Sequence, residues 1–408
     1  MRTLIRDVTA ITLDDQDRVL TGAEIALVDN RIAAVGQAPP DFDPHEVVDG
    51  REMVALPAFF SAHCHAAMTL ERGWAEDLPF ERWLNEKIWV AESALEEEDV
   101  YWGTALACCE MIRAGVIGFA DHYFWMDQTA RVVEESGMKA LLAWCHFGIG
   151  TEHELGKTTF EETVAFVERW KGAAGGRIRT TMGPHSPYMD PPDVLRRFVE
   201  EAHRIGVGAH FHLSESEEQL RNSVDRHGMT PVAHVDSLGL LDLPQPTLVA
   251  HCNVVTQEDL ALLSQRSTWV AHTPKTYLKL AMEMPPLARM LEEGVNVALG
   301  TDGPASNNDL NLMEIMRITG LYQKAALGDP EALPRIQLLR LATQAPAAAM
   351  GFPKSGVLAP GRPADLVLLD ATAPHWLPRH DPAAGVVYAA HPGDVATVWC
   401  DGQPLYRR

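Results

Sequence analysis

Residues 55–65 read Ala55-Leu56-Pro57-Ala58-Phe59-Phe60-Ser61-Ala62-His63-Cys64-His65, an apolar run that ends in two histidines. A continuous apolar run of this length predicts a buried strand over residues 55–63. Because side chains alternate along a strand, His63 and His65 share one face of its end and Cys64 takes the other. Two imidazoles on one face can bind one metal ion, so this stretch is both the first predicted strand and the start of a candidate metal site.

Seven more buried-strand patterns follow, separated by helical patterns. Strands are predicted over residues 116–121, 138–146, 177–183, 207–213, 247–252, 268–272 and 295–301. Helices are predicted over residues 98–114, 160–171, 192–205, 256–264 and 285–293. Eight strand–helix units predict an α/β fold, a (β/α)₈ TIM barrel over residues 58–350, whose active site lies at the carboxyl ends of the strands. A doubly wound sheet is the structural alternative, although no G-x-G-x-x-G follows a strand as its dinucleotide-binding form requires.

Both ends of the chain differ from this middle part. Short apolar runs separated by turn residues occur in residues 1–57, as at 25–28 and 31–35, and in residues 351–408, as at 364–369 and 395–399. Such runs predict small antiparallel β-structure on either side of the barrel.

Composition narrows the classes of partner. The 408 residues carry 34 basic and 56 acidic side chains, a net charge of −22. This charge disfavours nucleic acid and anionic membrane surfaces as partners. No apolar run is long enough for a transmembrane helix, and no signal peptide pattern opens the chain. Six cysteines without a C-x-x-C pair are typical of reduced thiols, so a cytoplasmic location is expected.

Further metal-binding side chains stand at the ends of other predicted strands. His212 ends the strand over 207–213, and Asp302 follows the strand over 295–301. With His63 and His65 they offer three nitrogen donors and one oxygen donor, a set that suits Zn²⁺ and leaves a position for water. His210 lies deeper on the same face as His212, and we expect it to be a packed barrel histidine.

Other zinc chemistries fit less well. The chain has no H-E-x-x-H helix and no cysteine pair of the cytidine-deaminase type. No lysine stands on the strand over 177–183, which disfavours a two-metal centre bridged by a modified lysine and favours a single metal.

Several ordered motifs resemble the amidohydrolase superfamily, specifically its S-adenosylhomocysteine and 5′-methylthioadenosine deaminases, and more broadly its triazine hydrolases and guanine deaminases. The motifs are 63–69 (HCHAAMT), 77–79 (DLP), 88–92 (IWVAE), 183–188 (GPHSPY), 212–215 (HLSE), 250–252 (AHC) and 300–308 (GTDGPASNN). The resemblance covers nearly the whole chain. It implies that residues 1–57 and 351–408 together form a composite β-sandwich beside the barrel, and that the protein is a homo-oligomer.

The resemblance also implies roles for individual residues. His63, His65, His212 and Asp302 would bind one divalent metal, zinc or iron. Asp302 and His251 would take the proton of the metal-bound water, and Glu215 would move a proton to the substrate ring nitrogen. Glu92 would hold ribose hydroxyls, and His185 would contact the substrate near the reacting centre. The plainer alternatives are a helix-start carboxylate for Glu215, a solvated helix face for Glu92, a hydrogen-bonded turn residue for His185 and a core histidine for His251.

The implied activity is that of a metal-dependent aminohydrolase. A zinc-bound hydroxide would replace the exocyclic amino group of a purine nucleoside or related nitrogen heterocycle with a carbonyl and release ammonia. One alternative is hydrolysis of an s-triazine with loss of chloride or an amine. Another is a non-catalytic barrel scaffold, which the complete set of candidate ligands disfavours.

The sequence departs from the family pattern where substrates are chosen. Trp144 lies on the strand over 138–146, where the family commonly has an Arg that would grip a polar tail, so S-adenosylhomocysteine is disfavoured. Thr273 and Tyr277 replace two Asn residues after the strand over 268–272, and Tyr277 would add an aromatic wall. We therefore expect Trp89, Trp144 and Tyr277 to contact the substrate. The wider group of Trp residues predicts either an aromatic face that stacks a flat ring or core and interface packing; it comprises Trp74, Trp83, Trp89, Trp125 and Trp144.

Overall fold

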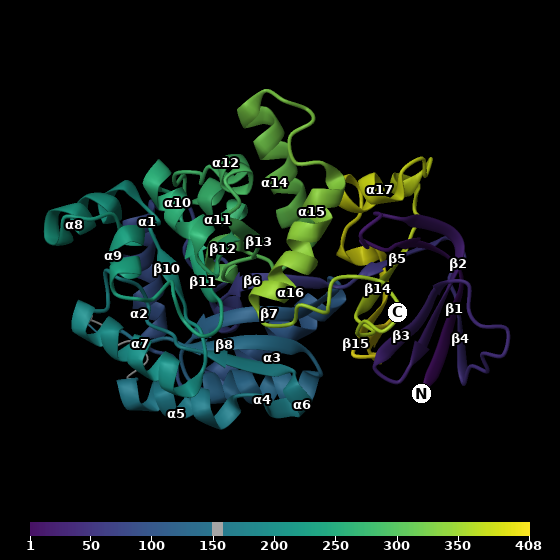
Figure 1. Cartoon of the computed structure of the whole chain (residues 1–408), viewed down its shortest axis with the longest axis horizontal. Coiled ribbons are helices and arrows are strands. Elements are labelled where there is room, and N and C mark those ends of the chain that lie inside the picture. The colour runs from purple at the N-terminus through teal and green to yellow at the C-terminus, as the bar shows by residue number, and fades with distance from the viewer. Residues whose placement is uncertain (149–157) are drawn as a thin grey trace.

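The computed structural model describes residues 1–148 and 158–408. Figure 1 shows two bodies side by side: a large one in which helices surround parallel strands, and a smaller one in which the purple amino-terminal strands and the yellow carboxyl-terminal strands lie together. The prediction that both chain ends are β-rich and flank an α/β middle is confirmed.

Eight parallel strands form two sheets of four in the large body. The first sheet has the order β6 (Phe59–Cys64), β7 (Val116–Tyr123), β8 (Lys139–Trp144), β9 (Ile178–Thr181). The second has the order β10 (His210–Leu213), β11 (Thr247–His251), β12 (Thr268–His272), β13 (Asn296–Leu299). Sequence neighbours are spatial neighbours throughout, as expected for parallel strands joined by helical crossovers.

Hydrogen bonds join the two sheets at two places. Beyond β9, the amide of His210 donates to the carbonyl of Met182 at 2.8 Å. On the other side, the amide of Asp302 donates to the carbonyl of His63 at 3.0 Å, and the amide of Thr301 donates to Ser61 Oγ at 3.0 Å. The last contacts bring the segment after β13 next to the end of β6.

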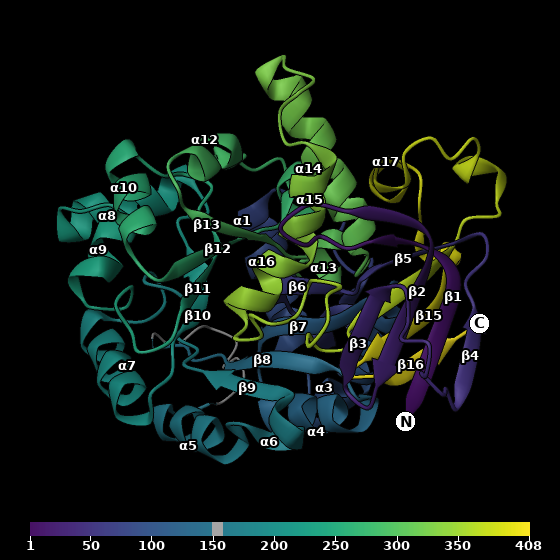
Figure 2. The same ribbon diagram turned by 45° about the vertical axis from the view of Figure 1, so that its right-hand side comes forward.

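Helices cover the parallel strands, as Figure 2 shows from a second direction, except the last α-helix, which lies at the small body. They are α1 (Phe80–Trp83), α2 (Trp89–Glu92), α3 (Glu97–Arg113), α4 (Met126–Ser136), α5 (Phe160–Trp170), α6 (Ala173–Gly176), α7 (Pro192–Ile205), α8 (Glu217–His227), α9 (Pro231–Ser237), α10 (Gln257–Gln265), α11 (Pro274–Lys279), α12 (Leu287–Glu292), α13 (Pro304–Asn307), α14 (Leu312–Leu327), α15 (Arg335–Ala342), α16 (Gln344–Ala349) and α17 (Pro382–Tyr388). A 3₁₀ turn, η1 (Ala66–Glu71), follows β6, and a π-helical segment, η2 (Leu84–Ile88), joins α1 to α2. Two further 3₁₀ turns are η4 (Pro374–Trp376) and η5 (Pro392–Asp394).

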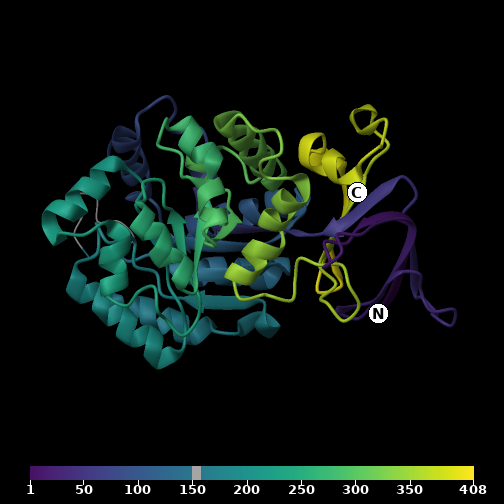
Figure 3. The same cartoon turned by 45° about the horizontal axis from the view of Figure 1, so that its top comes forward.

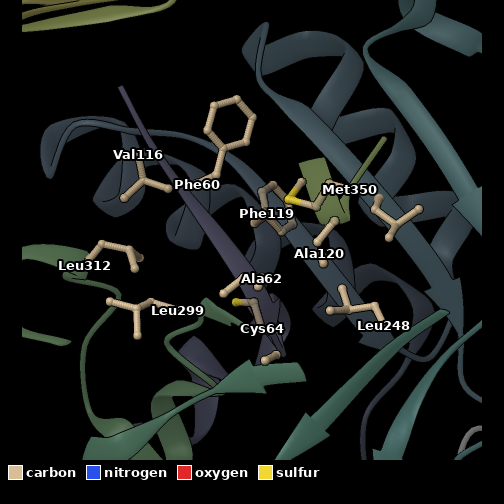
Figure 4. Close-up of a cluster of buried hydrophobic side chains, with 14 of the residues drawn as sticks. Phe60, Ala62, Cys64, Val116, Phe119, Ala120, Leu248, Leu299, Leu312 and Met350 are labelled. Atoms are coloured by element: carbon tan, nitrogen blue, oxygen red, sulfur yellow. The ribbon is translucent and has the colours of Figure 1, made fainter. Parts of the chain in front are cut away.

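The alternation predicted for the first strand is present in β6. Figure 4 shows Phe60, Ala62 and Cys64 along one side of the strand, within a cluster of buried apolar side chains. His63 lies on the opposite side, with none of its surface exposed. The packing of the apolar side against the surrounding helices fixes which way the histidine side faces.

The predicted strand over 55–63 is wrong as a single element. Residues Met53–Pro57 form β5, which pairs antiparallel with β14, whereas β6 begins at Phe59 and runs parallel to β7. The backbone changes sheets at Ala58, whose amide donates to Asp365, while the next amide, of Phe59, donates to Gly115. Pro57 has no amide hydrogen to offer either sheet, so the change of partner leaves no donor unpaired there.

The small body is one sheet of eight strands that draws on both chain ends (Figure 3). Its strands are β1 (Arg2–Ile11), β2 (Val19–Val28), β3 (Arg31–Gly36), β4 (Glu46–Asp49), β5, β14 (Leu366–Asp370), β15 (Val395–Cys400) and β16 (Gln403–Arg407). The expectation of purely antiparallel structure is wrong, because β4 and β5 both pair parallel with β1. Strands β4 and β5 lie along the same edge of β1, one after the other, because the chain crosses back to that edge between β3 and β4 and again between β4 and β5.

Among the described helices, none combines the length and the apolar character needed to cross a membrane.

Candidate active site

Four side chains from three separate strand ends meet in the large body. His63 and His65 come from the end of β6, His212 from β10, and Asp302 from the segment after β13. Asp302 Oδ1 lies 3.5 Å from His63 Nε2 and 3.3 Å from His65 Nε2. His65 Nε2 and His212 Nε2 are 3.3 Å apart, and one ligand atom from each of the three histidines lies within 4.8 Å of the others. Distances of this size around one point suit a tetrahedral metal ion.

The hydrogen bonds made by the Nδ1 atoms of the histidines determine which lone pairs face the point where the four side chains meet. His65 Nδ1 donates to the carbonyl of His122 at 2.7 Å, and His212 Nδ1 donates to the carbonyl of His185 at 3.1 Å. Each donation places the proton on Nδ1 and leaves the Nε2 lone pair free to bind a metal.

His210 fixes the same tautomer of His63, with the proton on Nδ1. The Nδ1 of His210 donates to the carbonyl of Leu248 at 2.8 Å, so its Nε2 is an acceptor. That Nε2 lies 3.0 Å from His63 Nδ1, which therefore carries the donated proton. His63 Nε2 is left buried with no hydrogen-bond partner among the described residues, and an orphaned buried nitrogen fits a metal ligand. His210 is thus packed, as predicted, and it also orients a neighbouring imidazole.

Burial keeps His63 and His212 neutral. It lowers the pKa of His212 to about 3, with the neighbouring His65 adding to the shift, and it lowers the pKa of His63 well below its ordinary value. For Asp302, burial acts to raise the pKa, but His65 and His251 beside it bring the pKa below its ordinary value. Neutral imidazoles and an ionised carboxylate are the forms that bind divalent cations.

Glu215 and His251 stand next to this set. His251 Nε2 lies 4.0 Å from Glu215 Oε2, and Tyr188 donates its hydroxyl proton to Glu215 Oε1 at 2.6 Å. Only 4% of each of these two predicted residues is exposed, and Glu215 directly precedes Ser216, the N-cap of α8, so the helix-start position also holds. The ring of His251 is held from behind, where its Nδ1 is 3.4 Å from both Tyr277 Oη and Thr273 Oγ1.

Three residues at the same place have a left-handed backbone conformation. Ser214, His251 and Asp302 have φ angles of 55°, 83° and 62°. The left-handed region is unfavourable for residues with a Cβ, and such residues cluster where surrounding structure fixes a functional geometry. All three follow or end a parallel strand, so the strain serves to turn side chains toward the common centre.

A cavity of about 670 Å³ opens over three of the four candidate ligands, while His63 is fully buried behind them. Its floor contains His65, His212, His251, Asp302 and Glu215. Most of its remaining wall is apolar and aromatic.

Glu92 also lines this cavity and is 4% exposed, so the alternative of a solvated helix face is wrong. Burial raises the pKa of Glu92 to about 8. Tyr123 lies between it and a second buried carboxyl, Glu71, and donates its hydroxyl proton to Glu71 Oε1 at 3.3 Å. Burial and the nearby Glu92 raise the pKa of Glu71 well above its ordinary value.

Two more histidines face the cavity. His185 lines it, stacks on Phe147 and has Nδ1 2.9 Å from Ser186 Oγ. His122, which the sequence analysis did not single out, is 1% exposed and has no partner for either ring nitrogen among the described residues. Buried polar atoms without protein partners are satisfied by water or ligand, so His122 is available to bind either.

Two predicted substrate contacts are wrong. Trp144 does not line the cavity; it packs edge-on against Phe166 of α5, with ring centroids 5.6 Å apart. Alternation along the chain explains this, because its neighbour Cys145 takes the inward position. Tyr277 is fully buried behind His251 instead of forming a cavity wall, and its hydroxyl accepts a hydrogen bond from the amide of Thr273 at 3.0 Å.

The five Trp residues do not form one aromatic face. Trp83 and Trp89 line the cavity, in line with the expectation for Trp89. Trp74 is 59% exposed, and Trp125 packs beside Phe124. Proximity in sequence was a poor guide here, because helices α1 and α2 bring two of the rings inward while the others lie on different faces.

Other cavity residues escaped the sequence analysis. Tyr188 stands inside the 183–188 motif and carried a usable signal. His122 directly follows the predicted strand over 116–121, the position at which the other histidines were found. Glu71 and Phe147 carried no signal, because a single Glu or Phe beyond a strand end is typical of ordinary surface or core positions.

Comparison with known proteins places this geometry in context. The profile described as "Amidohydrolase family" matches residues 54–405. A protein from Pelotomaculum thermopropionicum named 5-methylthioadenosine/S-adenosylhomocysteine deaminase is 43% identical over 99% of this chain and 93% of its own. The solved structure of an adenosine deaminase from Xanthomonas campestris with bound zinc superposes with a TM-score of 0.92, at 31% identity over 98% of this chain and 92% of that one. An atrazine chlorohydrolase from Arthrobacter aurescens complexed with zinc has a TM-score of 0.89 at 25% identity, over 99% and 95% of the two chains.

Proposed function

Since the chain belongs to the amidohydrolase family, we propose that it is a metal-dependent deaminase of adenine nucleosides. It is a hydrolase that acts on C–N bonds. The observation that carries the proposal is the convergence of three imidazoles and Asp302 on one point beside the cavity, with Glu215 and His251 alongside. Deaminase-named relatives reach higher identity than the triazine hydrolases, so the adenine nucleoside is preferred over an s-triazine.

We propose further that the two parallel sheets are the halves of one (β/α)₈ barrel over residues 58–350, flanked by a composite β-sandwich from residues 1–57 and 351–408. The hydrogen bonds from His210 to Met182 and from Asp302 to His63 support the barrel, because each joins segments of the two different parallel sheets. In such a barrel the site would lie at the carboxyl ends of the strands, where active sites of this fold occur.

A single divalent cation, proposed to be Zn²⁺ with Fe²⁺ as the alternative, fits the donor set of His63, His65, His212 and Asp302. The orphaned Nε2 of His63 and the donated Nδ1 protons of the other two histidines support the fit. Bound there, the cation would supply an acidified water at neutral pH.

Side chains of the protein then transfer the protons. Asp302 and His251 are placed to take a proton from a water that attacks the amino-bearing carbon of the purine. Glu215 in its acid form donates a proton to the adjacent ring nitrogen, and Tyr188, which hydrogen bonds to Oε1, directs Oε2 toward the reacting side. Return of a proton to the amino group releases ammonia and leaves a carbonyl. Proton transfers of this kind contribute typically ~10²–10⁴-fold to rate.

Glu92 is proposed to accept the ribose hydroxyls, and His185 to contact the ring near the reacting carbon. Both side chains are buried and line the cavity. A buried carboxyl group gains most from hydroxyl groups that pair with it, since they replace the water it has lost.

The test is ammonia release by the zinc-loaded protein from adenosine, adenine and a chlorinated aminotriazine. We expect adenosine to be deaminated, and Glu215→Gln to lower kcat by at least ~100-fold with metal content unchanged. The control Glu217→Gln removes an exposed carboxylate two residues away and should leave kcat unchanged. Inert amino-heterocycles, faster chloride release from the triazine, or full activity of Glu215→Gln would each contradict the proposal.

A further inference from the structure

We propose that His375, His391 and Asp394 form a second metal site, which would bind one Zn²⁺ or a chemically similar transition-metal ion. The three residues belong to the carboxyl-terminal segment, and none of them lines the cavity described above. The site is therefore separate from the proposed deaminase centre and does not depend on that function. The spacing of the donor atoms, the surroundings of the carboxylate and the exposure of the two rings support it.

The three donor groups come from two short turns. His375 lies in η4, His391 directly precedes η5, and Asp394 ends η5. His375 Nε2 is 2.9 Å from Asp394 Oδ2, His391 Nδ1 is 3.7 Å from Asp394 Oδ1, and one ligand atom from each residue lies within 4.8 Å of the others. Zinc–ligand bonds of ~2.0–2.2 Å place neighbouring ligands of a tetrahedral ion about 3.4 Å apart. The two observed distances fall on either side of this value, so small side-chain rotations would admit an ion.

A hydrogen bond explains only part of this arrangement. It accounts for the contact between His375 and Asp394, but the distance from His391 Nδ1 to Asp394 Oδ1 is too long for one. The two imidazole rings lie 4.5 Å apart at an angle of 33°. His391 Nδ1 also faces the amide of Asp394, but that amide already donates to the carbonyl of His391 at 2.9 Å. A metal ion at Nδ1 would therefore leave no donor unpaired, and it would engage both rings and the carboxylate at once.

The carboxylate of Asp394 is held in place by its surroundings. Asp394 is 4% exposed, and its Oδ2 accepts hydrogen bonds from Trp376 Nε1 at 3.2 Å and from the amide of His391 at 3.0 Å. Outer groups of this kind orient metal-binding carboxylates. Within the described part of the chain, no Lys or Arg forms an ion pair with Asp394. A cation from solution would thus supply the full counter-charge that a buried carboxylate favours.

The exposure of the two rings leaves the site open to solvent. The side chains of His375 and His391 are 32% and 53% exposed, so an ion can enter and a water molecule can complete its coordination. Two imidazoles and one carboxylate suit zinc, copper or nickel. Magnesium and calcium prefer ligand sets made of oxygen atoms, so they are disfavoured here.

An ion at this position would join the two turns on either side of α17. The chain between them contacts the large body, since Arg317 of α14 donates to the carbonyl of Val387 at 3.1 Å and Arg335 of α15 lies 2.6 Å from Asp381. Ligand binding to the closed form of a segment lowers the population of its open form. We therefore expect the ion to stabilise residues 374–394 locally.

The first experiment counts zinc sites by titrating the metal-free protein with Zn²⁺ in competition with a chromophoric chelator. We expect two sites in the wild-type chain and one in His391→Ala, whose exposed ring can be removed without loss of the fold. His65→Ala, which lacks a ligand of the candidate active site, should also keep one site, and the double variant should keep none. The matched control His380→Ala removes another exposed histidine of the same segment and should keep two.

The second experiment measures hydrogen exchange of residues 374–394 with and without Zn²⁺. At a zinc concentration ten times the Kd of the second site, exchange through local opening should slow about tenfold in the wild-type protein. His391→Ala should show no such change in this segment. This measurement does not use enzyme activity.

The results separate the two metal proposals. If the wild-type chain binds one zinc ion and His391→Ala binds none, the inference holds and the proposed active-site metal fails. An equal number of sites in His391→Ala and wild type would overturn the inference. An equal loss in His391→Ala and His380→Ala would also overturn it, and either result would leave the three side chains as a hydrogen-bonded turn.

Discussion

His210 is the residue on which the orientation of the His63 ring depends. His210 donates from Nδ1 to the carbonyl of Leu248, so its Nε2 accepts the proton of His63 Nδ1. The lone pair of His63 Nε2 then faces the metal position. Groups that hold a metal ligand in this way typically contribute ~10–100-fold to metal affinity. We therefore expect His210→Phe, which keeps a ring of similar size, to weaken zinc affinity by about that factor, measured by competition with a chromophoric chelator.

His234→Phe is the matched control for this measurement. His234 is a buried histidine on α9 that stacks on His227, away from the candidate ligands. Its replacement should leave zinc affinity unchanged. Equal zinc affinity of His210→Phe and the wild-type protein would show that packing alone holds the His63 ring.

The buried carboxyl of Glu71 should make the stability of the folded protein depend on pH. Burial and the neighbouring Glu92 raise its pKa in the folded protein, whereas in the unfolded chain it titrates near its ordinary value. Above that ordinary value the folded state binds more protons than the unfolded state, so stability falls as pH rises. Glu71→Gln keeps an acceptor for Tyr123 but cannot ionise, and it should gain over wild type as pH increases.

The measurement is the difference in Tm between Glu71→Gln and wild type at pH 5 and at pH 8, both zinc-loaded. We expect the variant's advantage to be larger at pH 8 by ~1–2 °C or more. Glu200→Gln, which alters an exposed carboxylate on α7, should show the same small difference at both pH values. A Tm difference for Glu71→Gln that does not change with pH would mean that Glu71 ionises freely in the folded protein.

Site residues were predictable where strand alternation and strand ends determine them. His63, His65 and His212 needed only the period of two and the meeting of parallel strands at one edge, and the structure brings them together. Trp144 and Tyr277 failed for the opposite reason. Each lies next to a lining residue, Cys145 and Thr276. A shift of one position reverses a side chain along the strand at Trp144 and turns it by about 100° on the helix at Tyr277.

At the scale of elements, helices with clear end signals were predicted closely. The helix predicted over 192–205 matches α7, which has Pro192 in its first turn and Gly206 directly after its end. That over 160–171 matches α5 within one residue, where Thr159 and Glu162 form a capping box. These signals are local, so they do not depend on knowledge of the fold.

Strand boundaries were less predictable because partners decide them. The apolar run over 55–63 gives no sign that its first half pairs with β14 and its second half with β7. The parallel pairing of β4 and β5 with β1 could not be predicted either. Hydrophobic periodicity and turn residues indicate which face of a strand is buried, but they do not indicate the direction of its neighbour. The π-helical segment η2, which positions Trp89 and Glu92 at the cavity, likewise has no sequence signature.

At the scale of the whole molecule, the two bodies are tied together by a buried ion pair. Lys139 on β8 donates to Asp365, which precedes β14, and to Asp401, between β15 and β16, at 3.0 Å for the latter. Lys139 is 3% exposed and Asp365 is 2% exposed. Burial acts to lower the pKa of Lys139, but the adjacent Asp365 raises it above its ordinary value, so the lysine is charged.

This pair predicts a large cost for removing one partner alone. Lys139→Met leaves Asp365 as a buried charge whose remaining donors are Ser355 Oγ at 2.6 Å and the amide of Asp401 at 2.8 Å. An uncompensated buried charge costs about 3–5 kcal/mol, so the free energy of unfolding in urea should fall by that amount.

Adding Asp365→Asn to Lys139→Met removes the charge and should restore part of the loss. Arg197→Met, which breaks an exposed pair with Glu161, should cost less than ~1 kcal/mol. Equal losses for Lys139→Met and Arg197→Met would show that the contact between the two bodies depends on apolar packing and that the ion pair contributes little.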